Sequence, residues 1–143
     1  MKKLLFVAVA IAGLALVSCN KDQAAVKKLD GAWTVTKAAG TTNGVTYDPV
    51  ASGDATMSMT FTACKLKTDE WCNTSSTVTF GTFPAATTSS VFRVTGDGTT
   101  MESKEHADST TVSTMTINEL TKTTMMATMV DGETTTVIEA TKN

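Results

Sequence analysis

The sequence predicts an all-β domain, an antiparallel meander of about eight strands that forms a closed or partly open barrel. Three observations carry this prediction. Short segments alternate apolar residues with Ser or Thr, as half-buried strands do. Asn-Gly and Asp-Gly dipeptides, which favour two-residue hairpins, stand between several of these segments. No apolar run with the helical period is long enough for a crossover helix, so we expect consecutive strands to pair antiparallel.

Residues 1–18 predict a secretory signal peptide. A positive start, Met1–Lys3, precedes an apolar run from Leu4 to Val17, which is shorter than the ~20 residues that span a bilayer. The run ends in Leu-Val-Ser-Cys, which resembles the lipobox of bacterial lipoproteins. That resemblance implies that Cys19 becomes the first mature residue and carries several acyl chains of the palmitate kind, which together anchor firmly. The alternatives are an uncleaved anchor or a signal peptide with an accidental Cys.

The remaining chain divides into a polar tether and one domain. We expect residues 19–28 to connect the lipid to the domain, with at most a short helical turn, and residues 29–143 to form the barrel. Removing the signal peptide takes away two lysines and no acid, so the formal net charge of −2 becomes more negative. Arg93 is the only Arg, and no basic cluster of the kind that binds nucleic acid is present.

The predicted strands follow one another with clear two-residue periods. Those with apolar residues on one face are AWTVTKA (Trp33, Val35), MSMTFTAC (Met57, Met59, Phe61, Ala63), STVTF (Val78, Phe80), SVFRV (Phe92, Val94) and TTVSTMTI (Met115, Ile117), followed by TTMMATMV and TTTVIEA. Val112 is out of phase, which indicates a bulge. The Thr-rich opposite faces are expected to meet water, with O-glycosylation as the alternative.

The connections between the strands carry turn residues. Hairpins are predicted at TNGV (42–45), TGDGT (95–99) and VDGE (130–133). The longest irregular stretches are expected at TYDPVASGD (46–54) and GTFPAATTSS (81–90). Loops of this kind on a rigid scaffold often carry recognition.

The other two cysteines, Cys64 and Cys72, are predicted to form a disulfide. Export permits one, and a hairpin centred on Thr68 would place the two residues opposite each other at a suitable separation. Two thiols without a nearby His make only half a zinc site. One difficulty is parity, because Cys64 falls on the face opposite Met57 and Phe61, whereas Cys72 shares the phase of Val78. A bulge between Cys72 and Val78 would reconcile the two faces.

A family resemblance appears where the domain begins. The segment Gly31-Ala32-Trp33, at the start of the first strand, resembles the Gly-x-Trp signature of lipocalins, and the chain as a whole looks most like the small lipocalin-like lipoproteins of bacteria. The resemblance implies an eight-stranded barrel in which Gly31 allows close backbone passage and Trp33 plugs the closed end. The family also packs an Arg from a late strand over the Trp. This chain has no late Arg, only Lys104, Lys122 and Lys142.

No motif predicts catalysis, a metal or a cofactor. The single histidine, His106, lies in a charged segment that suits a solvated loop, so we expect no enzyme activity. The chain is rich in methionine, which fills irregular cores, lines adaptable apolar cavities or, less often, binds Cu(I). The residues that would line a cavity are Met57, Met59, Phe61, Met115 and Met129.

Two functions therefore remain open at the level of sequence. In the first, an anchored monomeric barrel binds a small apolar ligand, as the lipocalin resemblance implies. In the second, a filled barrel acts through its loops as a protein-interaction or inhibitor module at the cell surface. Both place the protein in the cell envelope, lipid-anchored to the outer membrane and either periplasmic or surface-exposed.

Overall fold

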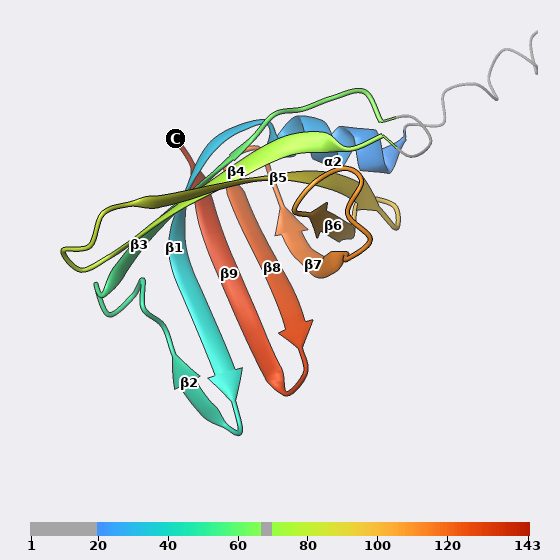
Figure 1. The fold of residues 1–143 in the computed structure, drawn as a ribbon. Coiled ribbons are helices and arrows are strands. Elements are labelled where there is room, and N and C mark those ends of the chain that lie inside the picture. The colour runs from blue at the N-terminus through green and yellow to red at the C-terminus, as the bar shows by residue number, and fades with distance from the viewer. Residues whose placement is uncertain (1–19, 67–69) are drawn as a thin grey trace, which may run out of the picture.

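The computed structural model describes residues 20–66 and 70–143 (Figure 1). Its elements are α2 (Lys21–Leu29), β1 (Gly31–Thr42), β2 (Val45–Tyr47), β3 (Ala55–Phe61), β4 (Cys72–Phe80), β5 (Ala86–Thr95), β6 (Thr100–Lys104), β7 (Ser113–Leu120), β8 (Thr124–Asp131) and β9 (Thr134–Lys142). In this part of the chain nine strands form one antiparallel sheet, and β1 also pairs with β9. Eight strands therefore close a barrel, and β2 is an extra strand beside the end of β1. The predicted all-β meander is confirmed and is consistent with a lipocalin-like barrel.

The hairpin connections follow the turn chemistry of the sequence. Asn43 and Gly44 both have positive φ, 51° and 76°, between the paired residues Thr42 and Val45. Because only Gly and a few polar residues adopt this conformation readily, the Asn-Gly dipeptide specifies the tight turn. The β8–β9 turn is displaced by one position from the prediction, since Asp131 still pairs with Thr134.

The register between β3 and β4 removes the parity difficulty without a bulge. Phe61 pairs with Thr74 and Met57 with Val78, in an unbroken ladder. This register places Met57 and Val78 on the same inner face, and Thr68, on which the hairpin was expected to centre, lies outside the described residues. Cys64 lies beyond the end of β3, where strand parity no longer constrains its side chain. The expected bulge between Cys72 and Val78 was wrong.

Two other expectations about strand irregularities are also corrected. Val112 precedes β7 and is exposed in a loop. It is out of phase with Met115 and Ile117 because it lies outside the strand, and not because of a bulge. The register shifts of the described strands lie at Val35/Lys37 and at Ile117/Glu119. The stretch 81–90 is only partly irregular, because β5 begins at Ala86 and carries Ser and Thr on both faces.

The barrel core is concentrated toward one end. The largest fully buried side chains are those of Trp33, Phe92, Leu29, Val26 and Cys72. The Phe61 and Phe92 rings meet edge to face, with centroids 5.1 Å apart, a favourable geometry for an aromatic pair. Burial of these aromatic and aliphatic groups is the dominant contribution to folding.

Helix α2 occupies the segment that was expected to be a tether. The Asn20 side chain accepts a hydrogen bond from the backbone N–H of Gln23 (3.0 Å) and caps the helix start. Asp22 in the first turn and lysines in the last turn match the helix dipole. Val26 and Leu29 are fully buried, so the helix closes one end of the barrel (Figure 1). The sequence did not show this because two buried turns are too short for a clear helical period.

The opposite end of the barrel is open and splits into two arms. β1 pairs with β3 only over Gly31–Thr34, and farther along the same edge it pairs with β2 over Gly40–Thr42. The first arm consists of β3, β4 and the start of β5; the second consists of β8, β9, the end of β1, and β2. Figure 1 shows the two arms diverging away from α2.

Candidate functional site

The closed end is sealed by the residues of the Gly-x-Trp motif. Trp33 is fully buried, and its Nε1–H donates to the backbone carbonyl of Leu29 at 2.6 Å. The Lys142 ammonium lies 5.2 Å from the Trp33 ring centroid and donates to the carbonyl of Lys28 at 2.9 Å. Lys142 thus lies over the Trp33 ring. The lipocalin resemblance implied an Arg at such a position, and the late part of this sequence contains none. Gly31 has φ of +111°, a conformation in which a side chain would be strained.

The disulfide fastens the β3–β4 connection to this end. Cys64 and Cys72 are bonded, with Cα atoms 5.3 Å apart, which confirms the predicted pair. The Gln23 side chain of α2 donates to the Cys64 carbonyl (2.8 Å) and accepts from the Leu66 N–H (2.7 Å). Helix, disulfide and connection therefore form one bonded unit. Cys19 lies outside the described residues.

The five residues predicted to line a cavity all face inward, but they differ in burial. Phe61 is 3% exposed and belongs to the packed core. Met57, Met59, Met115 and Met129 are only partly buried, and register places them on the inner face: Met57 opposite Val78, and Met115 between Met101 and Met129. By contrast, Met101 and Met125 are 6% and 2% exposed and act as core residues. Met57, Met59 and Met115 therefore pack against the core on one side and stay partly exposed on the other, toward the open end.

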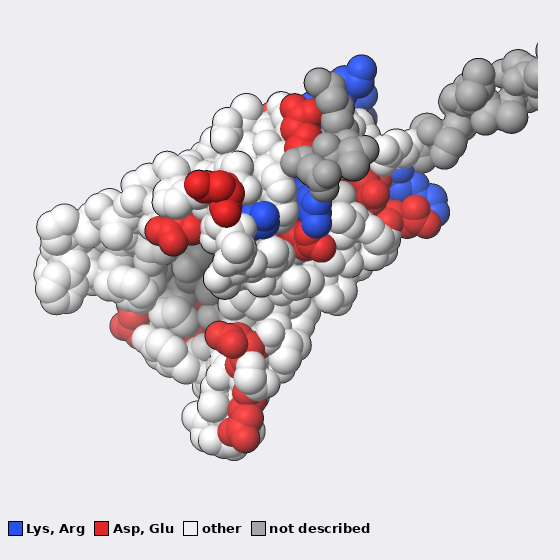
Figure 2. Space-filling model, turned by 45° about the vertical axis from the view of Figure 1, so that its right-hand side comes forward, with Lys and Arg blue, Asp and Glu red and all other residues white. Residues whose placement is uncertain are grey.

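Beyond these methionines, the inner faces of the two arms expose larger apolar groups. Tyr47 pairs with Gly40 and Val45 with Thr42 on the inner face of the second arm, and they are 58% and 72% exposed. Phe80 pairs with the buried Ala55 on the inner face of the first arm and is 54% exposed. Figure 2 shows a recess between two projecting arms. We call this recess the cleft. Strand register places Val45, Tyr47, Met57, Phe80, Met129 and Asp131 on the inner faces of the arms that border it.

The connection from β2 to β3 spans the gap between the arms. The Asp48 carboxylate accepts hydrogen bonds from the N–H groups of Ala38, Val50 and Ala51 at 3.0–3.2 Å. The Ala51 bond is the main cause of a lowered Asp48 pKa. The Ala38 bond ties the connection to the edge of β1 beyond its pairing with β3, and the other two bonds hold the connection's own backbone.

Asp54 ends the same connection and holds the cleft tyrosine. Its carboxylate accepts from the hydroxyls of Ser52 (2.7 Å) and Tyr47 (2.8 Å), and these bonds lower the Asp54 pKa. The hydrogen bond to Asp54 correspondingly raises the pKa of the Tyr47 phenol. The ring is thereby positioned on the inner face, with its hydroxyl already engaged.

A hydroxyl-lined pocket extends the open end toward β6 and β7. Its volume is about 330 Å³. Ser103 pairs with both Phe92 and Ser113 on the inner face. The lining residues are Ser90, Ser103, Lys104, Glu105, Ser109, Thr111 and Ser113. The open end thus combines thioethers, aromatic rings and hydroxyls, whereas the side chains at the closed end are fully buried.

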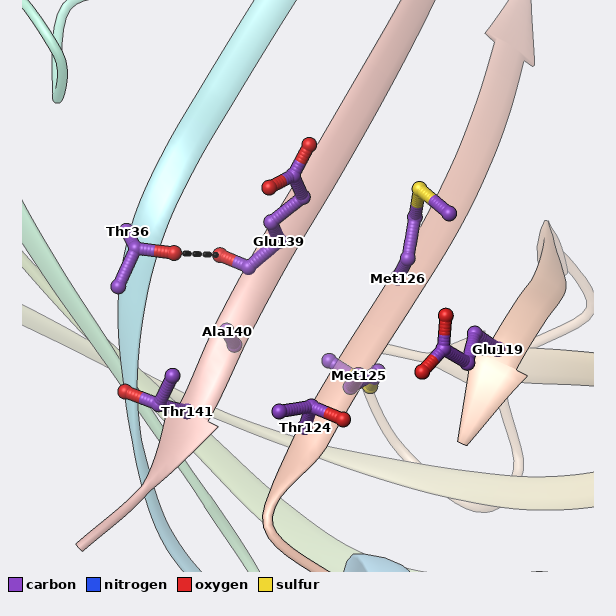
Figure 3. Close-up of a pocket in the computed structure, with 8 residues that line it drawn as sticks. All are labelled: Thr36, Glu119, Thr124, Met125, Met126, Glu139, Ala140 and Thr141. Carbon is purple, nitrogen blue, oxygen red and sulfur yellow. Dashed lines mark hydrogen bonds between the residues drawn. The ribbon is translucent and has the colours of Figure 1, made fainter. Parts of the chain in front are cut away.

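A second concavity, of about 350 Å³, lies on the outer face of β7, β8 and β9. Figure 3 shows Glu119, Met126 and Glu139 in a row across the three strands, and the Thr36 hydroxyl donating to the Glu139 carbonyl. Lys37 pairs with the Glu139 carboxylate at 3.0 Å. Met126 therefore points away from the barrel interior, unlike Met125 and Met129.

Sequence reasoning missed one cluster on the outer face of β5 and β6. The Arg93 guanidinium and the Lys104 ammonium lie 4.6 Å and 4.5 Å from the ring centroid of Trp71, and Arg93 Nε donates to Glu102 at 2.6 Å. The cross-strand pairing of Arg93 with Glu102 could not be found without the β5–β6 register. His106 is exposed in the β6–β7 loop, as expected.

The described residues contain no group of three or more His, Cys, Asp or Glu side chains that could hold a metal ion. Within residues 20–66 and 70–143, no helix is both long and apolar enough to span a membrane. In the comparisons with known proteins, no family model and no curated protein matches this chain. The open end remains the best-supported site, on geometry alone.

Proposed function

We propose that this protein is a lipid-anchored lipoprotein of the cell envelope whose lipocalin-like barrel binds a small apolar ligand at its open end. One observation carries the proposal: four inner-face methionines remain partly exposed beside a core that is otherwise closely packed. A barrel of this size is either filled by side chains or holds a small ligand. Here the filling stops at the level of Phe61 and Phe92, and apolar lining continues beyond it.

The chemistry of the lining supports an apolar or amphiphilic ligand. Methionine side chains adapt their shape to a guest, and Tyr47 and Phe80 offer exposed rings on facing arms. The adjoining hydroxyl-lined pocket adds hydrogen-bonding groups at the same open end.

The position of the anchor is compatible with this function. Asn20, the residue after Cys19, starts the helix that covers the closed end. A lipid on Cys19 would hold the closed end to the membrane and leave the open end accessible. Mass spectrometry of the mature protein tests the anchor: we expect the mass of a chain that begins at an acylated Cys19, and an unmodified thiol there would refute it.

The ligand site is tested with a Cys19→Ala variant of the full chain, exported and purified without detergent. We expect a neutral naphthylamine probe to bind with enhanced fluorescence. Met129→Gln should weaken that binding about five- to tenfold, since loss of an apolar contact costs roughly 1 kcal/mol. Met126→Gln, on the outer face of the same strand, is the matched control and should leave binding unchanged.

Circular dichroism and thermal unfolding check that both methionine variants are folded. Equal loss of affinity in the two variants, or no probe binding to the folded parent, would contradict the site.

A second function is favoured by a separate observation. Phe83, in the β4–β5 loop, is 73% exposed, and Val130, at the end of β8, is 66% exposed. Loops on a rigid scaffold often carry recognition, and these two side chains stand near the ends of the two arms. A solvent extract of the purified protein separates the two functions: co-purified apolar molecules favour ligand binding, and a clean extract favours the interaction module.

A further inference from the structure

We propose that the cleft selects cationic over anionic amphiphiles, so that the ligand is an apolar chain with an amine or ammonium head. This inference rests on the proposed ligand-binding function and specifies its ligand class. It follows from the distribution of charge around the cleft, which is one-sided.

The chain segments that form the two arms contain no Lys or Arg. None occurs in residues 38–64, 72–92 or 123–141. Figure 2 shows the tip of one arm without charged groups and the other arm with acidic groups toward its tip. Asp131 and Glu133 lie at the end of the second arm, and Asp48 and Asp54 lie in the connection between the two arms.

The nearest cations face away from the cleft. Lys37 lies on the outer face of β1 and pairs with Glu139. Lys104 lies on the outer face of β6, over the Trp71 ring, and also borders the hydroxyl-lined pocket next to the cleft. Lys142 shares the inner face with Trp33, but at the closed end. At the Asp131 rim, which lies apart from Lys104 on another strand, an anionic head group would therefore meet a carboxylate without a compensating cation.

Asp131 is the acid best placed to receive a cationic head. It follows Met129 by two residues on β8 and so lies on the inner face, at the rim. Its side chain makes no ion pair or hydrogen bond with another described residue. A chain lying along Met129 and Met57 would bring its head group to this rim, where a charge pair strengthens binding at low salt.

The test displaces the neutral probe with three dodecyl amphiphiles below their micelle concentrations: dodecyltrimethylammonium, dodecanoate and dodecyl maltoside. On the folded Cys19→Ala chain at low salt, we expect the cation to bind at least fivefold more tightly than the anion, with the neutral compound between them. The preference should shrink as salt is raised.

Asp131→Asn should reduce the cation-to-anion ratio at least twofold, whereas Glu119→Gln, on the outer face, should leave it unchanged. Equal or stronger binding of dodecanoate would overturn the charge selection and leave the ligand site standing. Failure of all three compounds to displace a bound probe would overturn both.

Discussion

The two ends of the barrel are built from the same strands but differ in how deeply their apolar side chains are buried. At the closed end, Trp33, Leu29 and Val26 are fully buried, and each polar contact, such as Trp33 to the Leu29 carbonyl, is made within the protein. At the open end, Tyr47 and Phe80 are exposed and the inner face carries partly exposed methionines. Stability is therefore concentrated around the helix, whereas the arms keep apolar surface exposed for binding. Three changes test that division.

Removing the Trp33 ring should have the largest effect. Trp33→Ala should lower the free energy of unfolding by about 3–5 kcal/mol, as expected for a buried aromatic residue replaced by Ala. The matched change at the open end, Tyr47→Ala, should cost less than about 1 kcal/mol because the ring is more than half exposed. Urea unfolding followed by circular dichroism measures both. Similar losses in the two variants would contradict the proposed division.

Removing the disulfide should have an intermediate effect, confined to the closed end. Replacing Cys64 and Cys72 together by Ala should cost roughly 2.5 kcal/mol in the chain-entropy model for a loop this short. Binding of the neutral probe at the open end should remain, measured well below the lowered unfolding temperature. A variant that is fully folded but no longer binds the probe would show that the two ends are coupled.

Acidification should have the smallest effect and should act first on the connection between the arms. Asp48 and Asp54 both have a pKa below the ordinary carboxyl value of 3.8. A carboxyl with a lowered folded-state pKa stabilises the fold above its unfolded pKa, and this contribution is lost as the pH falls through the folded pKa. Backbone amide NMR shifts of Val50 and Ala51 should therefore titrate below about pH 4. In Asp48→Asn that titration should disappear; its persistence would assign it to another group.

Much of the fold could be predicted because apolar residues alternate so regularly with Ser or Thr along the strands. Trp33 with Val35 and Phe92 with Val94 were assigned to the correct face from period alone, and the Asn43-Gly44 turn was located. The inner position of the five cavity residues was also predicted, as was the disulfide between Cys64 and Cys72.

What could not be predicted depends on contacts between distant segments. Helix α2 is stabilised by the burial of Val26 and Leu29 against the barrel, which no local pattern reports. The register of β3 on β4 differs by a single position from the simplest hairpin, and that shift places Met57 and Val78 on the same face. The cleft exists because β1 leaves β3 after a short pairing, which depends on the whole sheet rather than on any one strand.

That short pairing of β1 with β3 has a consequence for how this scaffold could diversify. In a barrel whose neighbouring strands pair along their full length, the number of strands and their stagger determine the width of the interior. Here the gap between β1 and β3 is spanned by residues 48–54, which the bond from the Ala38 N–H to Asp48 attaches to β1. Insertions or replacements in that bridge can change the size of the guest without altering a core side chain. Specificity and foldability are thus encoded in separate stretches of the chain, and selection can act on one without compromising the other.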